Sequence, residues 1–328
     1  MFRNFSIIAC LLLTLASACK KSDSTDNDGE WERSSDFEGV PRSAAFCFVA
    51  NNIAYVGTGF DGTNRLKDVW KFEPSKNNWY RVSDFPGEAR MYSVGFSVNG
   101  IGYVGTGSNG TAALKDFYAY NPTTDQWSKI ADFPAEARYG AVAFALNGKG
   151  YVGCGSDLNN YKDFYEYNPT TDSWTQVSSI PGNKRVNAFS FVIDGKAYVG
   201  GGINNGIYNT DFYAYDPQND QWTSLNSLYQ NSTYNYSLGR QSASTFTIGN
   251  KGYLAVGNNG ASLGDLWVYH VGSDYWEQMD TFEGSVRSEA IGFSIDGYGY
   301  VGTGRTGSSR FDDLWRYDPN GVAPDGEN

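Results

Sequence analysis

Histidine and cysteine are both scarce in this chain, which has one histidine, His270, and four cysteines in 328 residues. Because one imidazole cannot supply a zinc site built on several histidines, that class of metal site is excluded. A Ser-His-Asp or Cys-His catalytic set would need His270 beside a nucleophile. His270 falls at a turn after a predicted strand, so we expect a solvated turn residue there. We therefore predict no metal and no cofactor.

The chain also has fewer basic than acidic residues, with 25 Lys and Arg against 36 Asp and Glu, and its formal net charge is −11. A surface of this sign repels the phosphate backbone of nucleic acids. We therefore expect no nucleic acid among the partners.

Long apolar runs are absent except at the N-terminus, where the segment from Ile7 to Leu15 is apolar apart from Thr14. This run is too short to span a bilayer as a helix. It lies between a positive charge at Arg3 and the small residues Ala16-Ser17-Ala18, as in a secretory signal peptide.

The residues before Cys19 resemble the lipobox of bacterial lipoproteins, although Ala16 stands where that family usually has leucine. The resemblance implies a lipoprotein signal peptide over residues 1–18 and lipidation of Cys19. Residues 19–30 are polar, which predicts a flexible acidic tether. Its lysines followed by acidic residues are similar to the tethers of Bacteroidetes-type surface lipoproteins. We expect an outer-membrane protein, on the cell surface or the periplasmic side, that contacts the membrane through its lipid anchor only; the alternative is an ordinary secreted protein.

Six tryptophans recur at intervals of 48, 48, 47, 48 and 54 residues and reveal an internal repeat. A fixed period of this size is typical of repeat architectures. The tryptophans are Trp31, Trp79, Trp127, Trp174, Trp222 and Trp276. Each is followed by an arginine, and these are Arg42, Arg90, Arg138, Arg185, Arg240 and Arg287. We take residues 31–320 as one domain and residues 321–328 as a C-terminal tail.

Each unit predicts four short strands, a to d, separated by turns rich in Gly, Pro, Asn and Asp. A phenylalanine lies six residues after every arginine, and a smaller residue such as Cys47 lies one position before it. Since strand residues alternate between faces, we expect the bulky side of each strand a to fill the slim side of the next unit. Cys47 and Cys154 fall in non-adjacent units, too far apart to be bridged, so we predict two free thiols.

The repeat also predicts how the chain closes. There are six sets of strands a, b and c, but no tryptophan strand follows the sixth set, and a spare one begins at Trp31. The segment from Trp31 to Phe37 matches the segment from Trp79 to Phe85. We expect a ring in which the N-terminal strand serves as strand d of the sixth unit, which leaves only short, protected sheet edges.

These units resemble kelch repeats, which build β-propellers. The resemblance covers Trp31 to Pro319, although the family's double glycine is intact only at Gly200-Gly201-Gly202. It implies an all-β fold: a six-bladed kelch-type β-propeller with four antiparallel strands per blade, closed by the N-terminal strand in the last blade. We expect a monomer.

Antiparallel alternation places the b–c and d–a loops on the same face of such a ring. The b–c loops vary in sequence, and variable loops on a rigid scaffold often carry function. The connection from Trp222 to Arg240 is seven residues longer than its counterparts and carries Tyr234 and Tyr236 among Asn and Ser. Because this composition is typical of paratope loops, we predict that these tyrosines contact a ligand. A neutral lengthening of the loop is the alternative.

The arginines begin strand a, the strand nearest the axis, so they are candidates for a ring that binds carboxylates at the channel mouth. The alternative is that each arginine satisfies loop carbonyls or pairs with a neighbouring carboxylate. Two residues after each arginine the units differ, as a specific pocket requires. We therefore add Tyr92, Asn187 and Glu289 to the ligand-binding candidates.

Two functions remain open. The first is a non-catalytic binding module of the cell envelope that recognises a glycan or a protein at the b–c/d–a face. The second is a carbohydrate-active enzyme, either a lyase or an epimerase resembling the sialic-acid mutarotases that share this fold, with Glu289 near Arg287 as general base. Copper chemistry resembling that of galactose oxidase needs two histidines, which the chain lacks. The shortage of histidine favours the first function, and no catalytic residue is assigned.

Overall fold

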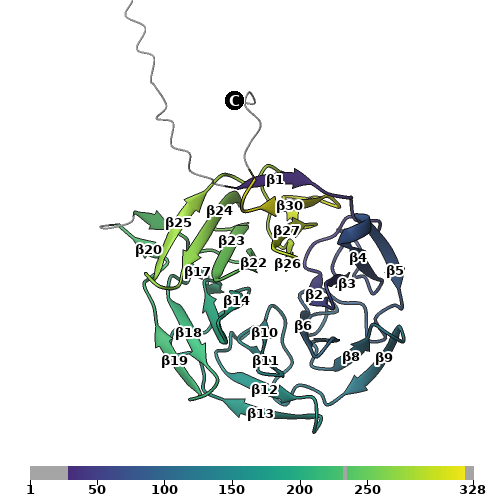
Figure 1. Cartoon of the computed structure of the whole chain (residues 1–328). Helices are drawn as coiled ribbons and strands as arrows, with labels where there is room; N and C mark the ends of the chain where they lie inside the picture. Colours follow the sequence, from purple (N-terminus) through teal and green to yellow (C-terminus); the bar gives the residue numbers. More distant parts are fainter. Residues whose placement is uncertain (1–28, 232–234, 322–328) are drawn as a thin grey trace, which may run out of the picture.

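The computed structural model of this chain describes residues 29–231 and 235–321. They form six four-stranded antiparallel sheets set around a central axis like the blades of a propeller (Figure 1). The predicted signal peptide, the Cys19 lipidation site, the tether up to residue 28, Tyr234 and the tail from residue 322 lie outside the described residues.

In each blade, strand a lies nearest the axis and strand d forms the rim. The strands, in the order a to d, are β2 (Phe46–Ala50), β3 (Ile53–Gly57), β4 (Val69–Glu73) and β5 (Asn78–Val82) in blade 1; β6 (Val94–Val98), β7 (Ile101–Gly105), β8 (Phe117–Asn121) and β9 (Gln126–Ile130) in blade 2; β10 (Val142–Leu146), β11 (Lys149–Gly153), β12 (Phe164–Asn168) and β13 (Ser173–Val177) in blade 3; β14 (Phe189–Ile193), β15 (Lys196–Gly200), β18 (Phe212–Asp216) and β19 (Gln221–Ser224) in blade 4; β22 (Ser244–Ile248), β23 (Lys251–Asn258), β24 (Ser262–His270) and β25 (Tyr275–Met279) in blade 5; and β26 (Ile291–Ile295), β27 (Tyr298–Gly302), β30 (Leu314–Asp318) and β1 (Glu30–Arg33) in blade 6.

Short elements decorate this framework. A 3₁₀ turn, η1 (Pro74–Lys76), joins β4 to β5. Three two-stranded hairpins lie in loops, and they are β16 (Ile203–Asn204) with β17 (Ile207–Tyr208), β20 (Tyr229–Gln230) with β21 (Tyr236–Ser237), and β28 (Arg305–Thr306) with β29 (Ser309–Arg310).

The ring closes as the repeat count predicts. Strand β1 pairs antiparallel with β30, with Trp31 opposite Tyr317 and Glu30 opposite Asp318. The two strands lie side by side in the last blade (Figure 1). Trp31 is only 3% exposed and packs against the rings of Phe246, Phe282 and Tyr317. The first described strand therefore completes the last blade, and the expected six-bladed architecture is confirmed.

The blades are held together by aromatic side chains packed against small residues. Phe48 of strand a lies against Gly102 in strand b of the next blade, where a Cβ atom would be 2.1 Å from its ring. Phe96 and Gly150 repeat this contact, where the Cβ atom would lie 2.0 Å away. At Gly102 and Gly150 even a methyl group would collide with the ring of the preceding blade, because protein cores are close-packed; blades 1 and 4 have the small residues Ala54 and Ala197 at this position, both fully buried.

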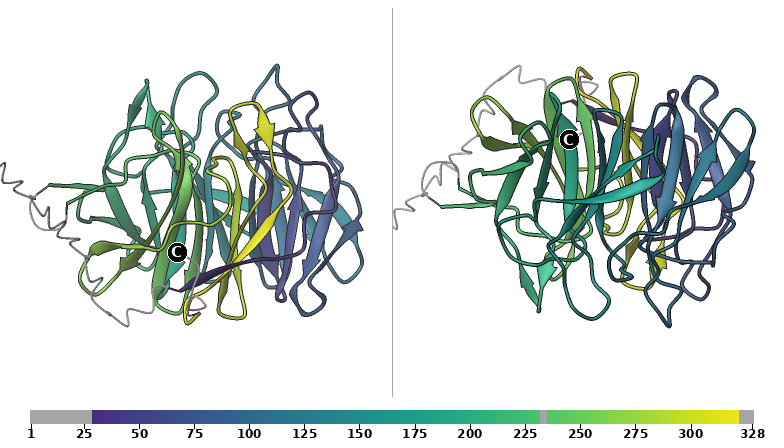
Figure 2. Two further views of the ribbon diagram at one scale, coloured as in Figure 1. Left: turned by 90° about the horizontal axis from the view of Figure 1, so that it is seen from above. Right: turned by 90° about the horizontal axis from the view of Figure 1, so that it is seen from below.

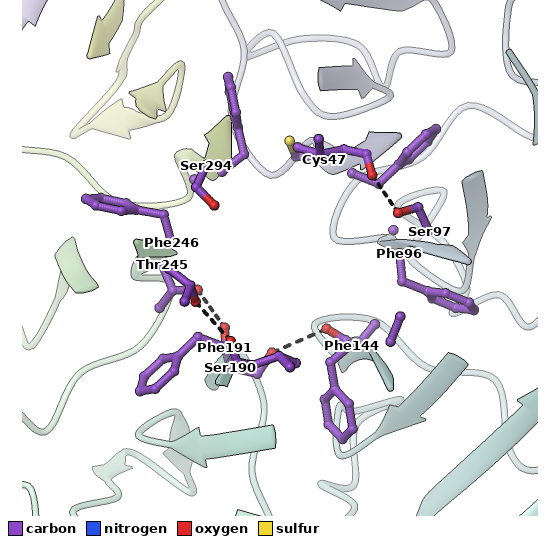
Figure 3. Close-up of a pocket in the computed structure, with 18 residues that line it drawn as sticks. Cys47, Phe96, Ser97, Phe144, Ser190, Phe191, Thr245, Phe246 and Ser294 are labelled. Carbon is purple, nitrogen blue, oxygen red and sulfur yellow. Dashed lines mark hydrogen bonds between the residues drawn. The ribbon is translucent and has the colours of Figure 1, made fainter. Parts of the chain in front are cut away.

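The small residues that precede the repeated phenylalanines of strand a, such as Cys47, do not pack where we predicted. Cys47, Ser190 and Thr245 line the axial channel, while Phe96 and Phe246 point away from it into the blades (Figure 3). The bulky residues therefore pack on strand b of the next blade and not on the slim side of its strand a. Small residues are needed at the axis because the six innermost strands converge there.

The two cysteines in the described residues are free, as predicted. Cys154 is fully buried and Cys47 is half-buried in the channel wall. Burial raises the pKa of the Cys154 thiol to about 12.

Candidate functional site

The ring has two unlike faces, seen edge-on in Figure 2. The a–b and c–d connections form one of them, which we call the turn face, and they are short: β2 and β3 are joined by Asn51 and Asn52 alone. The b–c and d–a connections form the other, which we call the loop face. Its loops are longer and differ between blades, so the loop face is where the sequence departs from the repeat.

A ring of six backbone hydrogen bonds surrounds the axis at the loop face. In each blade, the residue two positions after the arginine donates its N–H to the carbonyl oxygen of the equivalent residue in the preceding blade, at 2.8–3.0 Å. The residues are Ala44, Tyr92, Gly140, Asn187, Ser242 and Glu289. The ring is complete because Ala44 donates to Glu289 across the seam between blades 1 and 6.

All six residues of this ring have positive φ angles, between 52° and 59°. This region favours glycine, yet only Gly140 is a glycine, so five side chains are held in a conformation that costs free energy. This backbone conformation places all six residues around a cavity of about 170 Å³ at the channel mouth. Three of the candidates from sequence, Tyr92, Asn187 and Glu289, are therefore brought together in one cavity.

Tyr92, Glu289 and Arg305 form a polar cluster at this mouth. The Tyr92 hydroxyl donates to Glu289 Oε1 at 2.6 Å, and Arg305 Nη2 lies 2.8 Å from the same oxygen. The Glu289 side chain is only 7% exposed. Burial, and then the charge of Glu289, raise the pKa of Tyr92 above its ordinary value, so the hydroxyl stays protonated and remains a donor. Glu289 Oε2 accepts no hydrogen bond from the described residues and is left for a ligand.

Asn187 lies across the cavity from this cluster in the order of the blades. Its Nδ2 donates to Gln241 Oε1 at 3.3 Å, and that weak contact leaves amide groups that a ligand can use. The lining of the mouth cavity thus offers a carboxylate, a phenol and an amide, which are contacted by the Arg305 guanidinium and the Gln241 amide. This set can orient a polar ligand by hydrogen bonds.

The six repeated arginines are not part of the mouth, and their prediction as ligand-binding residues needs correction. Their side chains are 0–1% exposed, so no ligand can reach them. Each guanidinium forms an ion pair with the aspartate at the start of strand c in its own blade, and the pairs are Arg42–Asp68, Arg90–Asp116, Arg138–Asp163, Arg185–Asp211, Arg240–Asp265 and Arg287–Asp313.

Backbone carbonyls use the remaining donors of each arginine. Arg90 Nη1 donates to the carbonyl oxygen of Thr106 at 2.9 Å, and Nε donates to that of Glu88 at 2.9 Å. The arginine therefore ties the end of strand b and the start of strand c to the d–a loop. This is the structural alternative that the sequence left open, and it explains why the residue recurs in every blade.

The long d–a connection of blade 4 also differs from its prediction. Leu228 and Leu238 are fully buried at its base, where the Leu238 N–H donates to the Leu228 carbonyl at 2.7 Å. Between them the β20–β21 hairpin stands at the outer rim of the ring, away from the axis (Figure 1). Tyr236 is 4% exposed and packs near Trp267, so its ring is a core contact and not a ligand contact.

Two features of the loop face escaped the sequence analysis. One is Arg305, which the sequence could have revealed, because it is the only charged residue at its position in the six b–c loops. The other is a groove of about 430 Å³ between the b–c loops of blades 2 and 3, whose lining includes Arg65, Tyr139 and Leu158. Tyr92 lines both this groove and the mouth cavity, so the two are neighbours.

The described residues contain no cluster of three or more His, Cys, Asp or Glu side chains that could hold a metal ion. His270 stacks on Tyr275 at the end of β24, on the turn face, with Nε2 2.8 Å from Glu277. His270 is therefore a strand-end residue paired with Tyr275 and only 22% exposed at its side chain, and not the solvated turn residue that we predicted.

Across the part of the chain that the structure describes, no helix is long and apolar enough to cross a membrane.

Comparison with known proteins identifies the repeat. A family model described as the KLHDC2/KLHL20/DRC7 Kelch-repeats domain matches residues 132–296, just over half of the chain. A second model, the Kelch motif, matches residues 41–86 and 106–134. No curated protein matches the chain. A solved structure titled "Structure of YjhT" is similar with a TM-score of 0.72 and 17% sequence identity, over 85% of this chain and 95% of that chain. At that identity the likeness concerns the fold alone.

Proposed function

This chain belongs to the kelch-repeat family, and from that premise we propose that it is a non-catalytic binding module whose ligand docks on the loop face. Fold alone does not choose a function, since propellers serve both as enzymes and as binding proteins. The choice depends on what the side chains of the loop face offer.

The observation that carries the proposal is the distribution of exposed apolar side chains. Five large hydrophobic residues of the described chain are exposed. Four of them lie in loops of the loop face, namely Val40, Leu158, Ile207 and Val286, and the fifth, Tyr229, lies in the β20–β21 hairpin at the outer rim (Figure 1). The five residues are 48–94% exposed. None of the five lies in an a–b or c–d turn, so the exposed apolar side chains available for contact with a ligand are concentrated on the loop face. The turn face carries polar turns instead.

The cluster at the mouth supports the same face. Tyr92, Glu289 and Arg305 are pre-arranged by hydrogen bonds, and the backbone ring beneath them is rigid. Pre-organised groups lose little conformational entropy on binding, so they favour affinity and specificity. A ligand that covers the mouth would meet polar groups at the axis and apolar groups around them.

The N-terminal segment supports a location. A signal peptide over residues 1–18, lipidation at Cys19 and a tether up to residue 30 would hold the propeller at the outer membrane. Cys19→Ser tests this directly: we expect the variant to move from the membrane fraction to the soluble fraction and to lose incorporation of labelled palmitate. Unchanged fractionation would contradict the anchor.

The binding proposal is tested with the full-length chain on a glycan array and against a displayed peptide library. A loop-face variant replaces Val40, Ile207 and Val286 by serine, and a control variant replaces Thr124 and Asn219, exposed turn-face residues, by arginine. We expect the loop-face variant to lose at least tenfold in affinity and the control to bind like the original chain. The opposite result would place the ligand on the turn face and overturn the proposal.

A second candidate function is a carbohydrate-active enzyme, either a sugar epimerase or a lyase, and the free Oε2 of Glu289 favours it. Tyr92 and Arg305 both contact Oε1, so Oε2 is available to accept a proton from a sugar bound at the mouth. Glu289→Gln is the test. Turnover of a sugar that this variant abolishes, while binding is retained, would establish the enzyme and displace the binding module.

A further inference from the structure

We propose that the groove between the b–c loops of blades 2 and 3 is a docking site for a protein segment, with Leu158 as its apolar anchor and Arg65 as the contact for an acidic side chain. The inference rests on the proposed function, that a ligand docks on the loop face, and it narrows the ligand to a protein.

Leu158 is the most unusual residue of the loop face. It stands at the tip of its b–c loop with a φ angle of 130°, in the region that favours glycine, and it is 94% exposed. Blades 1, 2 and 5 have glycine at the equivalent tip, namely Gly62, Gly110 and Gly260, with φ angles of 108°, 96° and 115°. A leucine here is strained, and its side chain is almost entirely in water. The Leu158 N–H donates to Ser156 Oγ at 3.3 Å, but no contact of its side chain with the described residues covers its exposed surface, which points to a contact made outside the chain.

The groove beside Leu158 has the chemistry of a protein-binding site. Its lining includes Met91, Tyr92, Tyr139 and Leu158, and the rings of Tyr92 and Tyr139 lie 6.2 Å apart. Met and aromatic residues are enriched at protein interfaces, together with Arg. At about 430 Å³ the groove has room for a large apolar side chain and part of its flanking backbone.

Arg65 supplies the charge in this groove. Its guanidinium stacks on Phe60 at 5.0 Å and lies over Gly110, where a Cβ atom would be 2.2 Å from Cζ. It forms no ion pair with the described residues, and its buried Nε has no hydrogen-bond partner there. Asp157, which also lines the groove, already accepts the backbone N–H of Asn159 at 3.0 Å. An acidic side chain on the partner therefore complements Arg65, the one cationic side chain in the lining of the groove, while the Asp157 carboxylate also forms no ion pair with the described residues.

A glycan fits this groove less well. Sugars present hydroxyls on most of their surface, and burying these against Met91 and Leu158 would leave them without hydrogen bonds. A second copy of this chain is also disfavoured, because two bodies of net charge −11 repel each other. A protein segment with an apolar residue beside an acidic one can place the apolar side chain in the groove and pair the acidic side chain with Arg65.

The experiment selects a phage-displayed library of random dodecapeptides against the immobilised full-length chain, with a glycan array in parallel. We expect enriched peptides to share a large apolar residue next to Asp or Glu. For the best synthetic peptide, Leu158→Gly should weaken binding at least tenfold, and Arg65→Gln should weaken it and reduce its salt dependence. Thr124→Arg is the control: Thr124 is exposed in the c–d turn of blade 2 on the turn face, outside the groove, so binding should not change.

Thermal unfolding separates loss of binding from loss of fold. Because glycine relieves the strain at this φ angle, Leu158→Gly should keep the melting temperature of the original chain or raise it by about 2 °C. Three results would overturn the proposal that the groove binds a protein segment. Peptides could bind Leu158→Gly and the original chain with equal affinity, glycans could be enriched but no peptides, or the chain could self-associate in a way that Leu158→Gly removes. Those results leave loop-face binding standing, whereas a ligand lost only in the turn-face control variant overturns the proposed function itself.

Discussion

The closure of the ring yields the sharpest prediction, through the substitution Trp31→Ala. Trp31 is 3% exposed in β1, a strand of four residues paired with β30. It is the first described strand, and side-chain packing and this short ladder hold it against β30. Trp79, the equivalent residue of β5, is also 3% exposed, but the chain continues into folded structure on both sides of it.

The expected magnitudes follow from these positions. Removing a buried tryptophan side chain costs about 3–5 kcal/mol, so Trp31→Ala and Trp79→Ala should lower the free energy of unfolding by similar amounts. They should differ in how the ring opens. Without Trp31, β1 keeps its backbone ladder and two further hydrogen bonds, from Ser34 to Leu314 at 2.8 Å and from Phe37 to Asp312 at 2.6 Å. Such a segment should detach locally long before the molecule unfolds.

Urea unfolding measures the first quantity, and native-state hydrogen exchange read by mass spectrometry measures the second. In Trp31→Ala, the amides of β30 should exchange by local opening, faster than those of β4 and β8, its counterparts in blades 1 and 2. In Trp79→Ala, exchange in β30 should follow global unfolding. The reasoning is refuted by a cost below about 1 kcal/mol for Trp31→Ala. Equal protection of β30 in the two variants would refute it as well.

Three further predictions concern buried charges and thiols. Arg90→Met should lower the free energy of unfolding by about 3–5 kcal/mol, because it leaves the Asp116 carboxylate without its ion-pair partner. The double variant Arg90→Met/Asp116→Leu should recover part of this loss. A double-mutant cycle measured by urea unfolding would test both expectations. The free energy of unfolding should fall in acid. Burial opposes ionisation of Asp68, Asp265 and Asp313, but hydrogen bonds from their arginines outweigh burial and lower the pKa values of these carboxyls below 3.8. Their contribution to stability is therefore full above pH 3.8 and is lost as the pH drops through the lowered pKa values, which unfolding monitored from pH 6 to pH 2 would show. Cys154, whose pKa is raised to about 12, should not react with Ellman's reagent at pH 8 until urea unfolds the chain, and rapid labelling of the native protein would contradict its burial.

The fold could be predicted from the sequence because a repeat states each structural requirement six times. The spacing of tryptophans gave the number of blades, and the spare strand at Trp31 gave the closure, which the pairing of β1 with β30 confirms. Free thiols at Cys47 and Cys154 followed from their places in non-adjacent units. The same repetition misled the site prediction, because the six arginines recur for a structural reason, namely ion pairs within each blade.

Departures from the repeat were the better guide to the site. Tyr92, Asn187 and Glu289 occupy one column with six different residues, and the structure brings them to a single cavity. Arg305 and Leu158 are departures of the same kind within the b–c loops, and comparing those loops position by position would have found them. The tyrosine-rich insertion is also a departure, but the buried anchors Leu228 and Leu238 direct its hairpin to the outer rim.

The sequence by itself determined the number of blades, the strand order and the seam, because these depend on periodic patterns that local chain geometry and hydrophobic burial translate directly into strands. Only the tertiary structure decided which polar side chains are available. The sequence pattern of an arginine at the start of strand a is the same whether its guanidinium faces a carboxylate or water. Its fate depends on a partner about 26 residues away, Asp116 for Arg90, whose distance is set by the packing of the whole blade.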